Sequence, residues 1–316
     1  MKSLRLPAFA KINLCLHLLG RRADGYTEIR TIFQMISLHD ELRLELTRGR
    51  AIEMEIASTV ELARADAAAL RGRENLVYRA LETLRRELGM RSGIRATLVK
   101  NIPIGRGLGG GSSDAAAALL GLAGIAGRRI PLQKFIRMAS SLGTDVPFFL
   151  LGGRALGVGR GDEVYPLPAG PKAAVVVVSP AEIAVATRDA YRWARSSPRG
   201  RGHPELTKGR RAPKLGRFCA LCWSRQGTGV ANDFEAAVFR RHPRLRRLKQ
   251  ALLQEGAAEA ALAGSGSAVF GVFPNPAQAR RAAHGFPNDQ VFIVETLSRD
   301  EYRRALPARC RPGGTP

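Results

Sequence analysis

The chain has 316 residues, of which 45% are hydrophobic, so it is long enough for one large or two ordinary domains and is not wholly disordered. It carries 50 Lys and Arg against 27 Asp and Glu, a net charge of +23. Such a charge indicates an arginine-rich solvated surface, a nucleic-acid partner or a polyanionic small substrate. Aromatic residues make up only 6% and leave few platforms for stacking bases. A nucleotide substrate would account for local positive charge as well as a polymer would.

The four cysteines suit a reducing compartment, and we expect a cytoplasmic protein. Cys219 and Cys222 form a C-x-x-C, but no second pair and no histidine stands at zinc spacing, so no metal site is predicted there. The longest apolar run, residues 173–178, is far too short to cross a bilayer. The first residues lack the apolar segment of a signal peptide, so no membrane partner is expected.

Hydrophobic periodicity predicts alternating strands and helices along the chain. In the first half, we expect strands at residues 6–19, 29–46 (with a turn at His39 and Asp40), 52–56 and 94–99, and helices at 75–88, 114–122 and 132–142. In the second half, we expect a buried strand at 173–179, a helix near Thr187, a helix opened by a capping box of Asn232 and Glu235, a small-residue loop and strand at 260–273, a helix at 276–284 and a strand at 291–296.

Residues 195–228 change the character of the chain, because they are dense in Arg, Lys, Gly and Pro and poor in aliphatic side chains. We interpret them as an exposed insertion. The end of the chain from Pro307 is expected to fray.

Near the N-terminus, Lys11 and Asn13 are two residues apart in a predicted strand, so both side chains should point to one face.

The most informative stretch is residues 101–118, which read NIPIGRGLGGGSSDAAAA. Glycine permits close backbone approach, so consecutive amides can point into one concavity. Ser112, Ser113 and Asp114 are residue types that begin helices, and the alanines that follow are strong helix formers. A loop that opens directly into a helix N-terminus binds anions, and phosphate is the expected guest.

Three kinds of phosphate loop compete for this stretch. A Walker A loop needs a lysine after the second glycine, and none is present. Gly105, Gly107 and Gly110 match G-x-G-x-x-G, but Pro103 interrupts the approach of the strand, and arginines stand where the acidic residue of a dinucleotide site is needed. A flexible linker is excluded by Leu108 and the alanine helix. The third kind, P-x-G-x-G-L-G-G-G-S-S-D, resembles the ATP loop of the GHMP kinases.

Other blocks strengthen this resemblance. PAFAKIN at 7–13 with GRRADGY at 20–26, the glycine loop, and AGSGS at 263–267 resemble the three motifs of the GHMP kinases, in order. E-N-L-V, G-T-D-V-P-F-F and N-D-F-E are typical of the branch of this family that acts on a cytidine diphosphate sugar alcohol. The resemblance covers roughly residues 6–296, with the basic insertion outside it.

The resemblance implies an α+β fold of two domains, ribosomal-S5-like at the N-terminus and ferredoxin-like at the C-terminus, with the active site in the cleft between them. Residues 1–165 would form the ATP-binding domain, 166–300 the second domain with the insertion at about 195–228, and 301–316 a tail. The implied reaction is transfer of a phosphoryl group from ATP, with Mg²⁺, to the 2-hydroxyl of the cytidine diphosphate substrate in the non-mevalonate route to isoprenoids.

The resemblance also implies roles for individual residues. Lys11 and Asp145 match the catalytic pair. Positions that match the ATP site are Asn75, Lys100, Pro103, Gly105, Gly107, Leu108, Gly109, Gly110, Gly111, Ser112 and Ser113. Positions that match the acceptor site are Asn13, Tyr26, Thr27, Thr187, Tyr191, Gly264, Ser265 and Gly266, with the two tyrosines on either side of the cytosine. No metal ligand is implied.

Two residues depart from the family pattern. Thr27 stands where histidine is usual, and Arg106 replaces a small residue of the glycine loop. Two alternatives therefore stay open: another GHMP kinase such as homoserine kinase, and a basic nucleic-acid-binding protein, although nucleic acid is the less favoured partner. The chain is expected to be a monomer or a homodimer.

Overall fold

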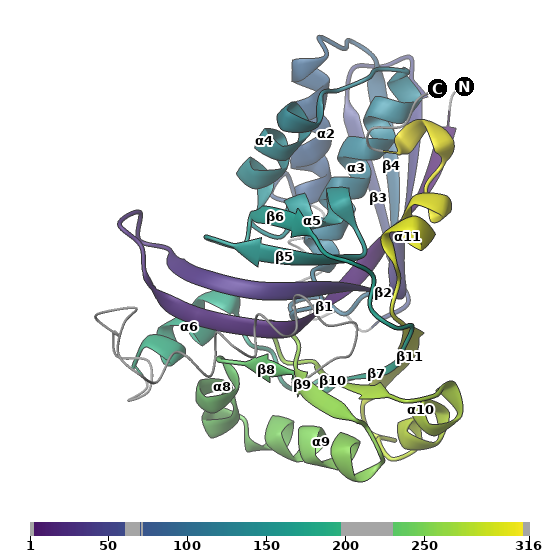
Figure 1. Ribbon diagram of the computed structural model, residues 1–316. Coiled ribbons are helices and arrows are strands. Elements are labelled where there is room, and N and C mark those ends of the chain that lie inside the picture. The colour runs from purple at the N-terminus through teal and green to yellow at the C-terminus, as the bar shows by residue number, and fades with distance from the viewer. Residues whose placement is uncertain (1–2, 61–69, 71, 197–229, 312–316) are drawn as a thin grey trace.

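The protein contains a seven-stranded sheet and a four-stranded sheet, each covered by helices on one face (Figure 1). The computed structural model describes residues 3–60, 70, 72–196 and 230–311. The first sheet has the order β3-β4-β2-β1-β8, and β5 and β6 extend it from β2. Its strands are β1 (Ser3–Arg21), β2 (Thr27–Thr47), β3 (Ile52–Ser58), β4 (Gly93–Lys100), β5 (Arg154–Val158), β6 (Glu163–Pro166) and β8 (Ala231–Asn232).

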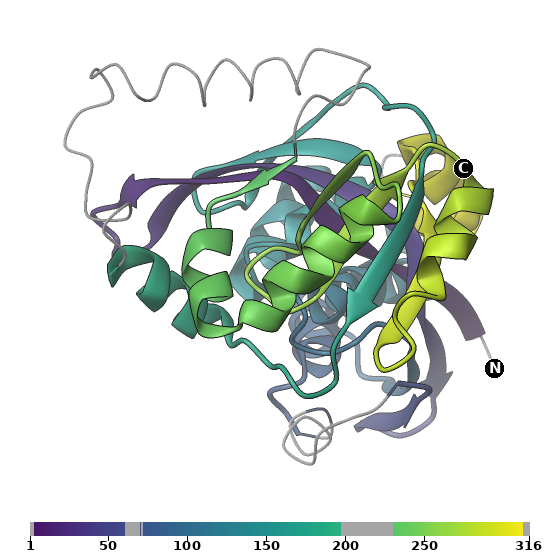
Figure 2. The same ribbon diagram turned by 90° about the horizontal axis from the view of Figure 1, so that it is seen from below.

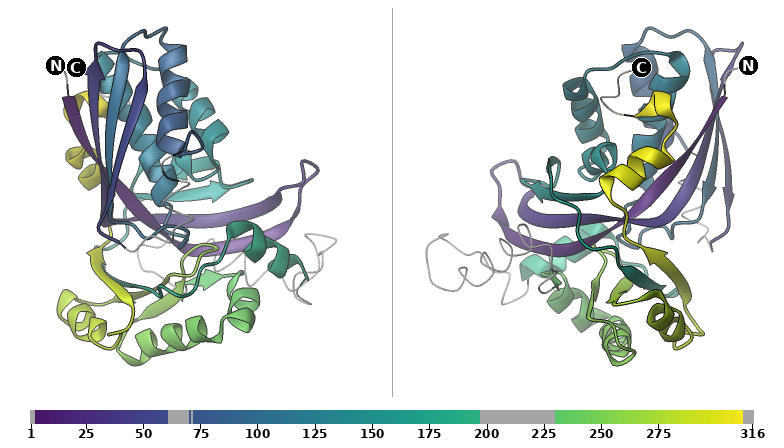
Figure 3. Two further views of the ribbon diagram at one scale, coloured as in Figure 1. Left: turned by 180° about the vertical axis from the view of Figure 1, so that it is seen from behind. Right: turned by 45° about the vertical axis from the view of Figure 1, so that its right-hand side comes forward.

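The long β1–β2 hairpin is the spine of this sheet and reaches beyond its helices (Figure 3). β1 is one continuous strand whose pairing with β2 has three register shifts, among them one between Phe9 and Lys11. The expected turn at His39 and Asp40 is wrong, because both residues lie inside β2. Asp40 is fully buried there and accepts hydrogen bonds from the backbone N–H groups of Asn101 (2.6 Å) and Ile102 (2.8 Å), which satisfy its charge within the sheet.

Four helices cover one face of the first sheet and form its main core. They are α2 (Leu76–Glu87), α3 (Gly110–Ala126), α4 (Leu132–Leu142) and α5 (Val146–Leu151). α3 is buried nearly all round, which its alanines allow because they let β1 and α2 approach closely. The expected start of this helix at Asp114 is wrong: it begins at Gly110, after Gly109 with φ +75°, so Ser113 and Asp114 lie within its first turns and are buried.

The four-stranded sheet has the order β11-β7-β10-β9 and is antiparallel at every pairing. Its strands are β7 (Ala174–Ser179), β9 (Glu259–Leu262), β10 (Val269–Phe273) and β11 (Gln290–Glu295). Strand alternation gives β7 two buried faces. Val175 and Val177 pack with residues of β1 and β2, whereas Val176 and Val178 pack beneath helices. Figure 2 shows these helices over the outer face: α8 (Glu235–Arg241), α9 (Pro243–Gln254) and α10 (Pro276–Ala283), with α6 (Thr187–Ser196) beside them.

The last described segment returns to the first sheet rather than fraying. α11 (Arg299–Ala305) places Tyr302 in the main core, where its hydroxyl donates to the Phe149 carbonyl at 2.5 Å. The short helix η1 (Ala308–Cys310) then buries Cys310 against α3 at Gly124. The expected fraying from Pro307 is therefore wrong for residues 307–311.

Some expectations are not tested by this structure. The basic insertion lies outside the described residues from residue 197 to 229, and so do Cys219 and Cys222. The domain division at residues 165 and 166 stays a prediction. In the described part of the chain, no helix is both long and apolar enough to cross a membrane.

Candidate active site

A cavity of about 530 Å³ lies where the glycine loop, strand β1, the start of α6 and the loop at residues 263–266 meet. The predicted residues that line it are Lys11, Asn13, Asn75, Lys100, Pro103, Gly105, Gly107, Leu108, Gly109, Gly110, Gly111, Ser112, Asp145, Thr187, Tyr191, Gly264 and Ser265. Four predicted residues do not line it: Ser113, Tyr26, Thr27 and Gly266. The fold thus brings together segments from both ends of the chain, and the roles of these residues stay predictions.

The glycine loop is held by backbone contacts on two sides. Lys11 N donates to the Leu108 carbonyl at 2.9 Å, which ties the loop to β1 where the register shift removes the usual partner. On the other side, the Gly107 and Gly266 backbones pack so closely that neither position has space for a side chain. The loop is therefore fixed between the two sheets, and it presents the N-terminal end of α3 to the cavity.

Lys11 is the central cation of the cavity, and only 4% of it is exposed. Its Nζ donates to Asn13 Oδ1 at 2.8 Å, which confirms that both side chains share one face of the strand. The Asn13 amide Nδ2 in turn donates to Thr31 Oγ1 at 2.7 Å, and Thr31 donates to the Cys15 carbonyl at 2.8 Å. This chain of hydrogen bonds orients the asparagine so that its oxygen faces the lysine.

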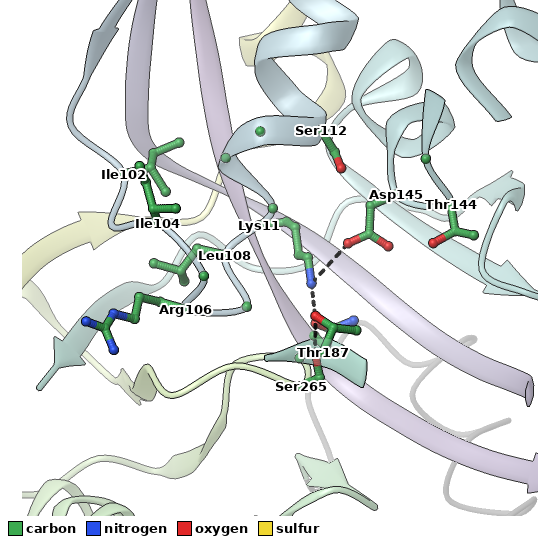
Figure 4. A pocket seen from close by; sticks show the side chains of 18 of the residues that line it. Lys11, Ile102, Ile104, Arg106, Leu108, Ser112, Thr144, Asp145, Thr187 and Ser265 are labelled. Carbon is green, nitrogen blue, oxygen red and sulfur yellow. Dashed lines mark hydrogen bonds and ion pairs between the residues drawn. The ribbon is translucent and has the colours of Figure 1, made fainter. Parts of the chain in front are cut away.

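Asp145 faces Lys11 from the other side of the cavity, with Oδ2 3.5 Å from Nζ. Figure 4 shows the two side chains pointing toward one another beside Ser112. Asp145 precedes α5, a helix in which Pro147 occupies the first turn. Its side chain remains 32% exposed, so the carboxylate is open to a ligand in the cavity and lies beside the buried Lys11 ammonium.

Lys100 lines the same cavity, but its ammonium is engaged from below. It pairs with Asp40 and donates to Asp114 Oδ2 at 2.7 Å, and all three side chains are buried. Burial alone would lower the pKa of Lys100, but Asp114 and Asp40 raise it above its usual value. Burial raises the pKa of Asp114 to about 8. The lysine side chain is thus held by two carboxyl groups beneath the loop, and its predicted part in binding ATP stays a prediction.

The predicted acceptor side contains one half-buried and one exposed tyrosine. Tyr191 packs edge-on against Phe234 with ring centroids 4.8 Å apart, and burial raises its pKa to about 12, so the phenol stays neutral. Tyr26 lies at the tip of the hairpin with 52% of its surface exposed, and the Arg160 guanidinium covers one ring face at 4.9 Å. Half-buried Thr27 follows it at the start of β2. In Figure 4, Thr187 and Ser265 lie together, with their hydroxyls 3.1 Å apart.

Several contributors were missed from the sequence. Arg160 and Phe234 line the cavity, and Asn232 supports it by donating to the carbonyls of Leu262 and Gly264. The expected capping box is wrong, because the Glu235 carboxylate accepts from Leu262 N instead of Asn232 N. The N-D-F-E block was the sequence signal for Asn232 and Phe234. Its polar side chains, however, form hydrogen bonds with residues in and beside the distant loop at 263–266.

Arg106, the departure in the glycine loop, points away from Lys11 (Figure 4). Its guanidinium donates to Ser267 Oγ at 2.9 Å and to the Ala181 carbonyl at 3.0 Å. The side chain therefore ties the glycine loop to segments beside the four-stranded sheet. Within the described ranges, no group of three or more His, Cys, Asp or Glu side chains is placed to hold a metal ion.

The chain is similar to known proteins over most of its length. Residues 75–153 match the GHMP kinases N terminal domain and residues 205–290 match the GHMP kinases C terminal domain. The chain is 42% identical over 299 residues to a 4-diphosphocytidyl-2-C-methyl-D-erythritol kinase of Solibacter usitatus, and the match covers 94% of this chain and 90% of that protein. A relative of the same name from Moorella thermoacetica is 40% identical over 90% of this chain and 94% of its own.

A crystal structure of 4-(cytidine 5'-diphospho)-2C-methyl-D-erythritol kinase superposes with a TM-score of 0.72 and 34% identity, over 93% of this chain and 99% of that one. These matches confirm the α+β fold and show that the protein is a kinase of a family that uses ATP. The chain belongs to the GHMP kinase family, and within it resembles the 4-diphosphocytidyl-2-C-methyl-D-erythritol kinases over nearly its whole length.

Proposed function

We propose that this protein transfers the γ-phosphoryl group of ATP to the 2-hydroxyl of 4-diphosphocytidyl-2-C-methyl-D-erythritol, a step in isoprenoid precursor synthesis. The observation that carries the proposal is the approach of Lys11 Nζ to Asp145 Oδ2, at 3.5 Å, in the cavity that the glycine loop also lines. The relatives supply the identity of the acceptor, since those that match nearly the whole chain carry this kinase name.

The triphosphate of ATP would lie on the glycine loop. Backbone N–H groups at the start of α3 and the positive end of its dipole favour phosphate oxygens there. The lack of side chains from Gly109 to Gly111 lets the phosphates approach the backbone. Lys11 Cγ lies only 3.1 Å from where a Gly109 side chain would start, so the lysine side chain runs beside the glycine loop. Its ammonium is therefore suited to contact the γ-phosphoryl group that is transferred.

Asp145 and Lys11 then have complementary tasks. Phosphoryl transfer needs positioning and charge neutralisation more than covalent help from the protein. The Asp145 carboxylate would orient the attacking hydroxyl and accept its proton. The Lys11 ammonium would stabilise the charge that moves through the phosphoryl oxygens, and Asn13 holds that ammonium in place.

Mg²⁺ would accompany ATP. Among the described residues that line the cavity, the carboxylates are Asp114, which is engaged by Lys100, and Asp145. Mg²⁺ commonly keeps several waters and binds through substrate phosphates with one or two carboxylates. This donor set fits an ion held chiefly by the nucleotide, and its charge would neutralise the phosphates. We assign it no protein ligand.

The acceptor would lie between β1 and α6. Thr187, Ser265 and Tyr191 line that side of the cavity, and Arg160 lies at its edge near Tyr26. A substrate that carries a diphosphate and a pyrimidine suits a wall with both a guanidinium and an aromatic ring. Because Arg160 covers one face of Tyr26, the cytosine would have to use the other face or displace the arginine.

The test is ADP release with a panel of acceptors: the cytidine diphosphate substrate, homoserine and mevalonate. We expect turnover with the first alone. Turnover only with homoserine or mevalonate would overturn the proposal. In the same assay, Asp145→Asn should lower kcat about a hundredfold or more. The matched control is Asp300→Asn, an exposed aspartate of α11 outside the cavity, which should retain activity.

A further inference from the structure

Asp40, Lys100 and Asp114 form a buried cluster beneath the glycine loop, with exposures of 0%, 2% and 2%. A methyl group at Gly110 would lie 3.2 Å from Lys100 Nζ, so the cluster is directly under the first residue of α3. Two carboxyl groups share one ammonium in this cluster. If both were ionised, a net negative charge would lie under the proposed triphosphate site.

The hydrogen bonds show which carboxyl group carries the charge. Asp40 accepts from three donors: two backbone N–H groups on Oδ1 and Lys100 on Oδ2. Asp114 accepts from Lys100 on Oδ2 at 2.7 Å, while its buried Oδ1 has no hydrogen-bond partner among the described residues. A buried ionised oxygen without a donor is costly, whereas a neutral acid tolerates it far better. The cluster is therefore neutral with Asp40 ionised and Asp114 protonated.

The surroundings single out Asp114 as the titrating member. Burial raises its pKa to about 8, and the charge of Asp40 adds to this effect against the attraction of Lys100. Lys100 stays charged at this pH because its two carboxyl partners raise its pKa. β1 contributes Lys11, which pairs with Asp145, and η1 contributes Cys310, whose pKa is raised to about 11 by burial at the other end of α3. The buried residues of α2 and α5 are apolar.

We propose that Asp114 controls ATP binding from beneath the glycine loop. The protein binds ATP more tightly when Asp114 is protonated, and loss of this proton weakens ATP binding. The inference rests on the proposed placement of the triphosphate on the glycine loop. Below the pKa of Asp114 the cluster is neutral; above it the cluster carries one negative charge that repels the phosphates. By linkage, ATP binding above about pH 8 takes up one proton from solvent.

The experiment is equilibrium binding of a non-hydrolysable ATP analogue to the full chain at about pH 7 and about pH 9.5. For the wild type we expect the Kd to rise about tenfold, the order expected for a unit charge within roughly 10 Å of the phosphates. Asp114→Asn has the same shape and is always neutral, so the ratio of its two Kd values should be near one. Asp40→Asn removes the ionised partner, so Asp114 should ionise in its place. The ratio of the two Kd values of this variant should also approach one.

A flat wild-type profile, or a tenfold rise that persists in Asp114→Asn, would overturn the proposal. Should the variants not fold, the infrared carbonyl band of a protonated carboxyl group in the wild type provides the test. It must be present at about pH 7 and disappear as Asp114 ionises, and its absence at about pH 7 contradicts the assignment. No acceptor is present, so a wrong acceptor leaves this experiment intact, whereas failure to bind the analogue at either pH would overturn both proposals.

Discussion

Two glycines of the same loop make a matched pair for testing how the loop is held. Gly105 and Gly107 both have positive φ, +68° and +81°. A methyl group at Gly105 would meet nothing within 4 Å, so Gly105→Ala should cost about 1 kcal/mol in unfolding free energy for the left-handed backbone alone. A methyl group at Gly107 would lie 2.8 Å from the Ala263 carbonyl carbon and 2.9 Å from Gly266 N, and closer still to the Ala263 oxygen.

These neighbours of Gly107 are backbone atoms, so relief requires movement of the loop at residues 263–266. Overpacking of this kind adds about 1–3 kcal/mol, and we expect Gly107→Ala to cost about 2–4 kcal/mol in total. Urea unfolding measures both variants, and the KM for ATP should rise more in Gly107→Ala because the loop is displaced. Equal unfolding free energies for the two variants would refute the claim that backbone contact with this second loop holds the glycine loop in place.

Two further changes test the lysine and the C-terminal anchor. Lys11→Met removes the cation between Asn13 and Asp145 and should lower kcat by about two to three orders of magnitude, as measured by ADP release; a loss of less than about threefold would contradict its role. Tyr302→Phe leaves the buried Phe149 carbonyl without its donor and should cost about 1–2 kcal/mol in urea unfolding. Tyr26→Phe, at an exposed position, is its control and should change stability by less than about 0.5 kcal/mol.

Much of the local structure could be predicted from sequence patterns. The helix at residues 132–142 is confirmed at both ends, and the helix at 75–88 begins one residue after Asn75, whose side chain caps it. The shared face of Lys11 and Asn13 followed from strand alternation alone. These features depend on periodicity and capping, which are encoded within a few residues of the position concerned.

Two of the errors share one cause, which is a partner far away in the chain. His39 and Asp40 resemble a turn because they are polar, yet Asp40 lies inside a strand and pairs with Lys100, 60 residues later. Glu235 resembles the second half of a capping box, yet its carboxylate accepts from Leu262 N. Local propensity predicts solvent or a cap for such residues, whereas a distant buried donor changes the outcome.

The sequence by itself determined the family, the glycine loop and the residue types of the site, because three motifs can be identified in order without knowledge of the fold. Only the tertiary structure decided that Lys11 meets Asp145 and that Lys100 faces two carboxyl groups beneath the loop. It also decided that the chain returns through α11 to bury Tyr302. The physical reason is that ion pairs and core contacts depend on which surfaces pack together, and this packing is settled by the whole chain at once.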